Sequence, residues 1–183
     1  MANLEIYIIG ENKYSLFLCE LAYSCGFIVK PFNKNLSAQS VSGKLFLLSI
    51  INNKERAKLS NRILELGGFI PNLIHPTSVI YPSAVLDSSG IYIGAYTNIH
   101  DNVFIKEGNI ILSGVNIFKS CIISKFCFLS EGSTIGADTL LESFVTMGSG
   151  SISITNSCSV VGEGSHISSK KWLIRNIPAN SKI

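Results

Sequence analysis

The sequence predicts a small α/β domain over residues 1–74, a parallel β-helix over residues 75–169 and a C-terminal tail over residues 170–183. Two observations carry this prediction. In the first 74 residues, short apolar strands alternate with helices, which is typical of a small parallel sheet. From Ile93 onward an aliphatic residue recurs at every sixth position, a period that neither a helix nor a hairpin produces.

The composition indicates a folded chain with a substantial core. Apolar residues make up 46% of the sequence and charged residues 15%, against a usual charged share of about 25%. This excludes a disordered chain and a coiled coil. The net charge of +3 is too small to indicate a nucleic-acid partner.

Targeting signals are not expected. No apolar run is long enough to span a membrane, and the opening MANLEIYIIG lacks the basic start of a signal peptide. The five cysteines are odd in number and form no Cys-x-x-Cys pair, which indicates reduced thiols in a cytoplasmic protein.

The first domain is expected to alternate strands and helices. The expected elements are a strand at 4–10, a helix at 15–25, strands at 27–32 and 45–51, and a helix at 54–66. In the first helix, Leu16, Cys19 and Leu21 follow a helical spacing. A single glycine, Gly10, stands at the first strand–helix turn. It can mark a phosphate site or a plain βα turn.

The six-residue period predicts a triangular coil, in which three hexads make one turn and residue n lies over residue n+18. The aliphatic positions are Ile93, Ile99, Ile105, Ile111, Ile117, Ile123, Leu129, Ile135, Leu141 and Met147. Cys121 and Cys127 are one hexad apart, on different faces of the triangle. We therefore expect buried free thiols there rather than a disulfide.

Several stretches resemble one family, the sialic-acid O-acetyltransferases and bacillosamine N-acetyltransferases, which are hexapeptide-repeat sugar acyltransferases. The matching stretches are Ile8-Ile9-Gly10, Ser49-Ile50, Asn53-Lys54, Leu73-Ile74-His75-Pro76, Val161-Gly162-Glu163-Gly164-Ser165 and Asn176-Ile177-Pro178-Ala179-Asn180. The resemblance implies a Rossmann-like first domain, a left-handed coil and a homotrimer. It also implies acetylation of an amino or hydroxyl group on a nucleotide-linked sugar by acetyl-CoA, in surface polysaccharide or glycan biosynthesis.

The resemblance also implies binding residues. Those expected to hold the nucleotide-linked sugar are Gly10, Asn12, Asn53 and Arg56. Those expected to line the coenzyme A site are Thr146, Gly148, Gly162, Lys170 and Lys171. Lys170 and Lys171 fit a solvated basic tail equally well.

The catalytic positions depart from the family pattern. Lys119 stands where the family has its catalytic histidine, Phe118 where it has the acidic partner, and Ser120 follows. His100 with Asp101 is an alternative base one coil earlier. We therefore expect altered or weak catalysis, with a catalytically inactive β-helical trimer that binds sugar or acts as a scaffold as the alternative.

The remaining candidates have plainer interpretations. Lys119 and Asp101 are expected to form a surface ion pair, because they stack one coil apart. His75 is expected at the domain junction and His166 in solvent. The separations of the three histidines do not fit a metal site, so no metal is expected. Trp172 is expected to pack the tail against the last coil.

Overall fold

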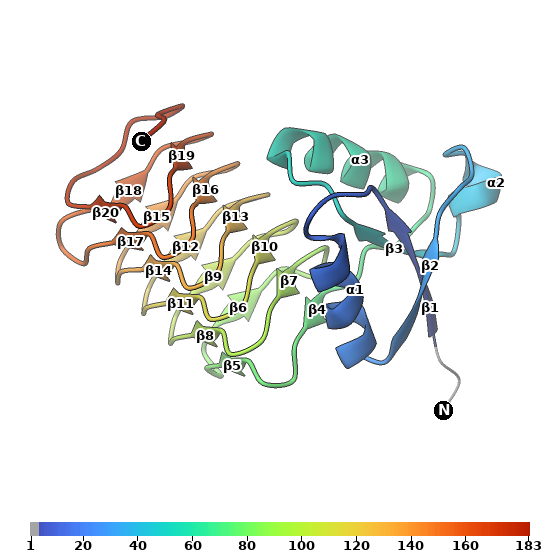
Figure 1. Ribbon diagram of the computed structural model, residues 1–183, viewed down its shortest axis with the longest axis horizontal. Coiled ribbons are helices and arrows are strands. Elements are labelled where there is room, and N and C mark those ends of the chain that lie inside the picture. Colours follow the sequence, from blue (N-terminus) through green and yellow to red (C-terminus); the bar gives the residue numbers. More distant parts are fainter. Residues whose placement is uncertain (1–3) are drawn as a thin grey trace.

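The structure is a computed structural model that describes residues 4–183, and it consists of an α/β part beside a long parallel β-helix (Figure 1). The α/β part contains a three-stranded parallel sheet in the order β2-β1-β3. Its strands are β1 (Leu4–Ile9), β2 (Phe27–Pro31) and β3 (Leu45–Leu48), and its helices are α1 (Ser15–Ser24), α2 (Ala38–Val41) and α3 (Asn53–Glu65).

Helix α1 buries only part of the expected helical stripe. Its buried side chains are Leu18, Leu21 and Ala22, which follow the i, i+3, i+4 spacing of a helical stripe. Leu16 is 71% exposed and Cys19 is half-buried, so only Leu21 of the three apolar residues at helical spacing lies on the buried face. Helix α2 was not expected. It is a single turn started by Ser37, whose hydroxyl accepts a hydrogen bond from the Ser40 backbone N–H (3.3 Å).

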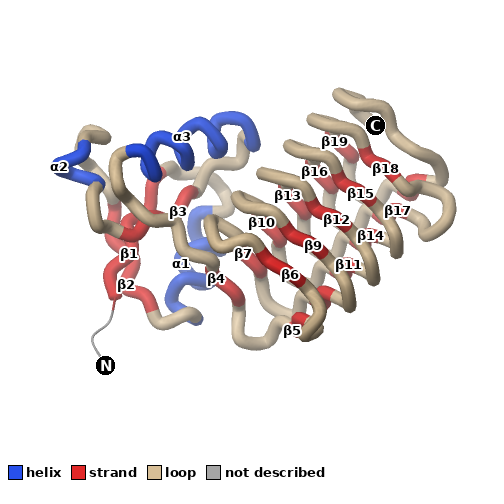
Figure 2. The backbone as a smooth tube through the Cα atoms, turned by 180° about the vertical axis from the view of Figure 1, so that it is seen from behind, coloured by secondary structure: helices blue, strands red, loops and turns tan. Residues whose placement is uncertain are grey.

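The β-helix is built from two-residue strands stacked in three parallel sheets, as the period of six predicts. We call the first sheet the docking sheet, because the α/β part packs on it. It contains β4 (Leu73–Ile74), β7 (Tyr92–Ile93), β10 (Ile110–Ile111), β13 (Phe128–Leu129), β16 (Thr146–Met147) and β19 (His166–Ile167). We call the second sheet the polar sheet, after Asn98, Asn116 and Thr134 on its central strands. It contains β5 (Val79–Ile80), β8 (Asn98–Ile99), β11 (Asn116–Ile117), β14 (Thr134–Ile135), β17 (Ile152–Ser153) and β20 (Trp172–Leu173). The apolar sheet contains β6 (Val85–Leu86), β9 (Phe104–Ile105), β12 (Ile122–Ile123), β15 (Leu140–Leu141) and β18 (Val160–Val161), and Figure 2 shows these five strands side by side.

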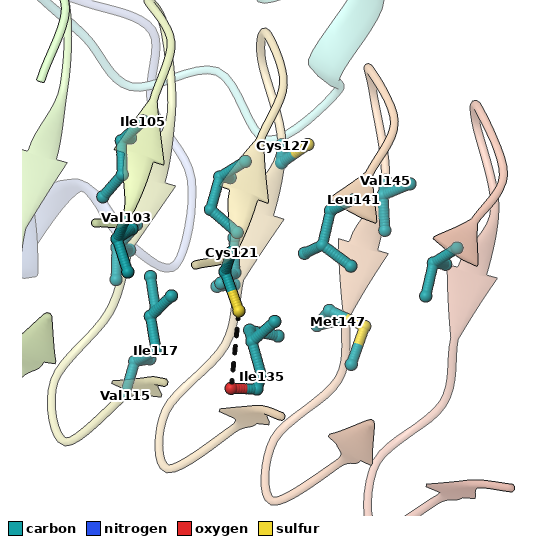
Figure 3. Packing of buried hydrophobic residues seen from close by; sticks show 14 of the residues in the cluster. Val103, Ile105, Val115, Ile117, Cys121, Cys127, Ile135, Leu141, Val145 and Met147 are labelled. Carbon is teal, nitrogen blue, oxygen red and sulfur yellow. Dashed lines mark hydrogen bonds between the residues drawn. The ribbon is translucent and has the colours of Figure 1, made fainter. Parts of the chain in front are cut away.

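The interior of the coil is a stack of aliphatic side chains (Figure 3). Ile117 and Ile123 are fully buried, which confirms their predicted inward direction. Cys121 and Cys127 are separate buried thiols, and the Cys121 Sγ–H donates to the Gly136 carbonyl oxygen (3.0 Å). Burial raises the pKa of Cys121 to about 11 and that of Cys127 to about 12.

The coils differ slightly in length. Leu73 pairs with Tyr92, Tyr92 with Ile110, and Leu140 with Val160, so the separations are 19, 18 and 20 residues. The extra residues of the longest coil enter the turn at 155–157, where Asn156 adopts a left-handed backbone with φ +63°. The three sheets remain in register because the added length is absorbed at a corner.

The segment expected to be a tail continues the β-helix. It contains β20, which pairs with β17, and it adds bridges from Val161 to Ile177 and from His166 to Lys182. Trp172 is 69% exposed, so the expectation that it packs the tail was wrong. It occupies an outward position of β20, while the neighbouring Leu173 points inward. Within residues 4–183, no helix is long and apolar enough to cross a membrane.

Candidate functional site

The two parts meet across the docking sheet. Its outward side chains on the first four coils, Leu73, Tyr92, Ile110 and Phe128, are buried in one core with the α/β part. The Leu48 N–H donates to the Tyr92 hydroxyl (3.0 Å). The last two strands, β16 and β19, are not covered in this way: Thr146 is half-buried and His166 is exposed. Lys13, Tyr14 and Ile51 of the α/β part line a hollow with Thr146 and His166, so the uncovered end of the docking sheet faces loops of that part.

Arg56, near the start of α3, joins the two parts. Its side chain is 1% exposed, and all three guanidinium nitrogens donate hydrogen bonds. The acceptors are the carbonyl oxygens of Ile50, Ile51, Gly108, Phe126 and Cys127 and the side-chain oxygen of Asn53, at 2.9–3.4 Å. Burial lowers the pKa of Arg56 to about 10, so the guanidinium stays charged at neutral pH. The geometry leaves no donor for a ligand, contrary to the expected substrate role.

A cleft opens where the docking sheet is uncovered. It consists of two adjoining hollows of ≈330 Å³ and ≈270 Å³ that share Ile51, Thr146 and His166. Asn52, Asn53, Lys54, Phe144 and Gly164 complete the first hollow. Residues from both parts line the second: Lys13, Tyr14, Phe128, Ser130, Gly148, Ser149, Ile167, Ser168 and Ser169. We call these two hollows the interdomain cleft.

The cleft carries positive charge. Lys13 and Lys54 line it, and no acidic side chain of residues 4–183 does. The first turn of α3 also lies at the cleft, with Asn52 as its N-cap: the Asn52 side-chain oxygen accepts from the Lys54 and Glu55 N–H groups (3.0 and 3.1 Å). A helix N-terminus carries partial positive charge. Together with the two lysines, it makes the cleft suited to an anionic ligand.

The expected phosphate loop is occupied by its own contacts. The Asn12 side-chain N–H group donates to the carbonyl oxygen and the hydroxyl of Ser49 (2.6 and 2.9 Å), and the Asn12 oxygen accepts from the Tyr14 N–H (2.8 Å). A Cβ added to Gly10 would collide with the Ser49 carbonyl oxygen. Gly10 therefore permits close packing of the loop, and neither it nor Asn12 lines the cleft.

The other expected binding residues divide into two groups. Thr146 and Gly148 line the cleft, and Asn53 also reaches it while its amide donates to the Thr146 hydroxyl (3.2 Å). Gly162 does not, because it packs against the Ala179 backbone. Lys170 and Lys171 lie at the far tip of the coil. The structure thus brings together only part of the expected coenzyme set.

The catalytic candidates lie at another corner of the coil, between the polar and apolar sheets. His100 follows β8, and its ring is stacked between Tyr81 (centroids 5.2 Å apart) and Phe118 (4.9 Å). Ser120 has a left-handed backbone with φ +58°, and its N–H donates to the Asp101 carbonyl oxygen (3.0 Å).

The expected Lys119–Asp101 ion pair is not among the ion pairs of residues 4–183. The two residues share a column, but their side chains do not meet. Lys119 is instead an exposed cation beside the aromatic ladder of Tyr81, His100 and Phe118.

Sequence reasoning missed the place of His166. It was expected in solvent, and it is exposed, but it lies in both hollows of the cleft. The stacking register carried the signal: His166 pairs with Thr146 in the docking sheet, and Thr146 was already a candidate. His75 lines a different hollow beside α1. No cluster of three or more His, Cys, Asp or Glu residues that could hold a metal forms among residues 4–183.

No family model matches the chain. Among solved structures, it resembles the acetyltransferase domain of PglB from Neisseria gonorrhoeae FA1090 in complex with acetyl coenzyme A (TM-score 0.57, 18% identity, covering 99% of this chain and 96% of that one). It also resembles PerB from Caulobacter crescentus in complex with CoA and GDP-perosamine (TM-score 0.56, 19% identity, 100% and 94%). A third similar structure is WeeI from Acinetobacter baumannii AYE (TM-score 0.85, 14% identity, 98% and 96%). The chain therefore has the fold of these structures, a left-handed parallel β-helix preceded by a small α/β part.

Proposed function

We propose that the chain transfers the acetyl group of acetyl-CoA to an amino or hydroxyl group of a nucleotide-linked sugar, in surface polysaccharide or glycan biosynthesis. The observation that carries the proposal is the interdomain cleft, which is basic, free of acidic side chains among the described residues and lined from both parts. Nucleotide-linked sugars and coenzyme A are both anionic through their phosphates. The shared fold with the PglB domain and PerB, solved with acetyl coenzyme A and with CoA and GDP-perosamine, supports it.

In this proposal Lys13, Lys54 and the first turn of α3 bind phosphate groups of these anionic ligands. Thr146 and Gly148 form the cleft wall beside them. His166, which can donate and accept hydrogen bonds, orients the ligand between them. This assignment replaces the expected phosphate roles of Gly10, Asn12 and Arg56, whose polar groups are used within the fold.

His100 is our proposed general base. Its ring is stacked between Tyr81 and Phe118, and a neutral imidazole nitrogen can accept a proton from an attacking amine or hydroxyl. The acceptor amine or hydroxyl attacks the thioester carbonyl carbon, and His100 takes its proton. The tetrahedral oxyanion then expels the coenzyme A thiolate, which receives that proton. The Lys119 ammonium and the Ser120 hydroxyl donate hydrogen bonds to the oxyanion. A protonated lysine is better suited to this role than to that of a general base.

The position of these groups supports a homotrimer with sites shared between subunits. His100 belongs to the corner between the polar and apolar sheets, whereas the cleft belongs to the docking sheet, so they lie on different sides of one coil. The outward residues of the apolar sheet are all hydrophobic: Val85, Phe104, Ile122, Leu140 and Val160. Burying this face between copies would bring the corner of one subunit toward the cleft of the next.

Light scattering should therefore give three times the monomer mass, and Ile122→Lys should dissociate the assembly. Ile122 is exposed on a folded coil, so this variant should keep its strand content by circular dichroism. A wild type that remains monomeric at micromolar concentration would contradict both the trimer and the shared site.

The activity test is mass-spectrometric detection of acetylated product from acetyl-CoA and a panel of nucleotide-linked amino sugars. We expect His100→Gln to lower kcat by ~10²–10⁴-fold, and Lys54→Glu to raise KM. His75→Gln, outside the cleft, is the matched control and should change neither. Mixing His100→Gln with Lys54→Glu subunits should restore activity, because hybrid trimers contain sites with an intact base and an intact cleft.

Binding without turnover separates the alternative function. If acetyl-CoA and a nucleotide-linked sugar raise the melting temperature but no product forms, the chain is a β-helical sugar-binding or scaffold protein. If neither ligand shifts the melting temperature, the proposal fails. We also place the protein in the cytoplasm, in keeping with its five free thiols.

A further inference from the structure

Residues 170–183 form the end of the β-helix farthest from the α/β part (Figure 1), and they carry exposed basic and apolar side chains. We call it the tip patch: Lys170, Lys171, Trp172, Ile174, Arg175, Lys182 and Ile183. Residues 170–183 hold four of the chain's 15 Lys and Arg residues and none of its 12 acidic residues. This segment has a formal charge of +4, whereas the rest of the chain sums to −1.

Large hydrophobic side chains lie among these cations. Trp172 is 69% exposed, Ile174 68% and Ile183 41%. They line a common hollow of ≈380 Å³ together with Lys171 and Arg175. Neighbouring Leu173 and Ile177 are buried and fill the interior of the last coil. The exposed Trp172, Ile174 and Ile183 are therefore not part of that interior. Single exposed apolar residues are common on protein surfaces, but a cluster of large exposed hydrophobic side chains marks a surface that binds a membrane or another molecule.

The cations of the tip patch are available to a ligand. None of the four forms an ion pair with a carboxylate of residues 4–183. Lys170 has a left-handed backbone with φ +59° and directs the chain around the corner just before Trp172.

We infer that the tip patch binds the surface of an anionic lipid bilayer. Tryptophan favours the boundary between headgroups and acyl chains. Clustered Lys and Arg are attracted to anionic headgroups by about 1 kcal/mol each, or about five-fold in partitioning. Trp172, Ile174 and Ile183 enter the boundary region, and the four cations contact the headgroups. Attachment is peripheral, and it is independent of the proposed acetyl transfer.

The test uses the whole protein and vesicles of phosphatidylcholine alone or with 30% phosphatidylglycerol. Trp172 is the only tryptophan of the chain, so its emission reports on the patch directly. We expect a blue shift and co-sedimentation with the anionic vesicles only, both weakened by added salt. Lys170→Glu with Lys171→Glu should lower the partition coefficient at least 25-fold, about five-fold for each cation lost.

A charge-matched control separates local from overall attraction. Lys34→Glu with Lys58→Glu changes the net charge equally at exposed positions of the α/β part, and should lower partitioning less than two-fold. Ile174→Ser keeps the reporter and should reduce the blue shift.

Absence of a blue shift with anionic vesicles would overturn the inference, as would equal losses in the two double variants. A shift caused by soluble coenzyme A and not by vesicles would overturn it in favour of the coenzyme role of Lys170 and Lys171. Melting temperatures of all variants within a few degrees of wild type would establish that they are folded.

Discussion

Replacing Arg56 by methionine should weaken the attachment of the α/β part to the β-helix. The change removes a buried guanidinium that donates to six oxygens. Cys127 O also accepts from the Ile110 N–H, but the carbonyls of Gly108 and Phe126 then lose their protein donor. Breaking a buried charged network costs about 3–5 kcal/mol, and methionine recovers part of the packing. We expect a loss of about 3 kcal/mol in the free energy of unfolding.

The assay follows urea unfolding with two probes. Far-ultraviolet circular dichroism at the helical minimum reports on the α/β part, which contains all three helices of the described chain. Trp172 fluorescence reports on the last coils of the β-helix. The two transitions should coincide in the wild type and separate in Arg56→Met, with the helical transition at lower urea. Arg62→Met, on the exposed side of the same helix with Glu65 as its partner (3.5 Å), should cost under ~1 kcal/mol. Equal shifts in the two variants would refute the role of Arg56 as a joint.

Three further outcomes follow from the fold. Ile117→Ala should cost ~2–5 kcal/mol of unfolding free energy, because the side chain is fully buried in the coil. Lys125→Ala removes a surface ion pair between the exposed lysine and the half-buried Glu107 (2.7 Å) and should cost under ~1 kcal/mol. Urea midpoints that shift equally in the two variants would contradict the hexad register. Burial raises the pKa of Cys127 to about 12 and that of Cys121 to about 11 from 9.0, so the folded state keeps protons that the unfolded chain releases. The stability that these thiols contribute should be fully present below pH 9 and fall as the pH rises above it, by up to ~1.4 kcal/mol per pH unit for each thiol. Cys127→Ala should therefore reduce, but not abolish, the slope of a plot of urea midpoint against pH. Gly10→Ala, with φ +94° and a Cβ that would meet Ser49, should lower the melting temperature, whereas unchanged stability with weaker ligand binding would restore the phosphate role expected from the sequence.

The sequence was sufficient for the architecture because each coil repeats the same local rule. An inward aliphatic residue at every sixth position must be buried, and only stacking at about 18 residues achieves this, so the pairing of Ile99, Ile117 and Ile135 could be predicted. The α/β part was also predictable as alternating elements. The buried face of α1 was not, because Leu16 and Leu18 are equally apolar and their burial depends on what the helix packs against.

The candidate site was less predictable because it depends on how two parts of the chain meet. Arg56 matched a binding motif, but the adjacent β-helix supplied carbonyl oxygens that occupy its guanidinium. His166 had no local motif, and only the uncovered end of the docking sheet makes it a cleft residue. Contacts between residues ~50–110 positions apart in the sequence carry no periodic signal that a single sequence could reveal.

The unequal coil lengths of 19, 18 and 20 residues have an evolutionary consequence. A chain of this kind can gain or lose residues at its corners without disturbing the ladders, because each strand needs only its neighbours above and below. Insertions at the turn over 155–157 should be tolerated as readily as surface loops elsewhere, whereas a single residue added between two ladder positions reverses the inside and outside of a strand. Related proteins can therefore acquire new loops at the corners, and with them new specificities, while the stacked strands of the β-helix stay unchanged.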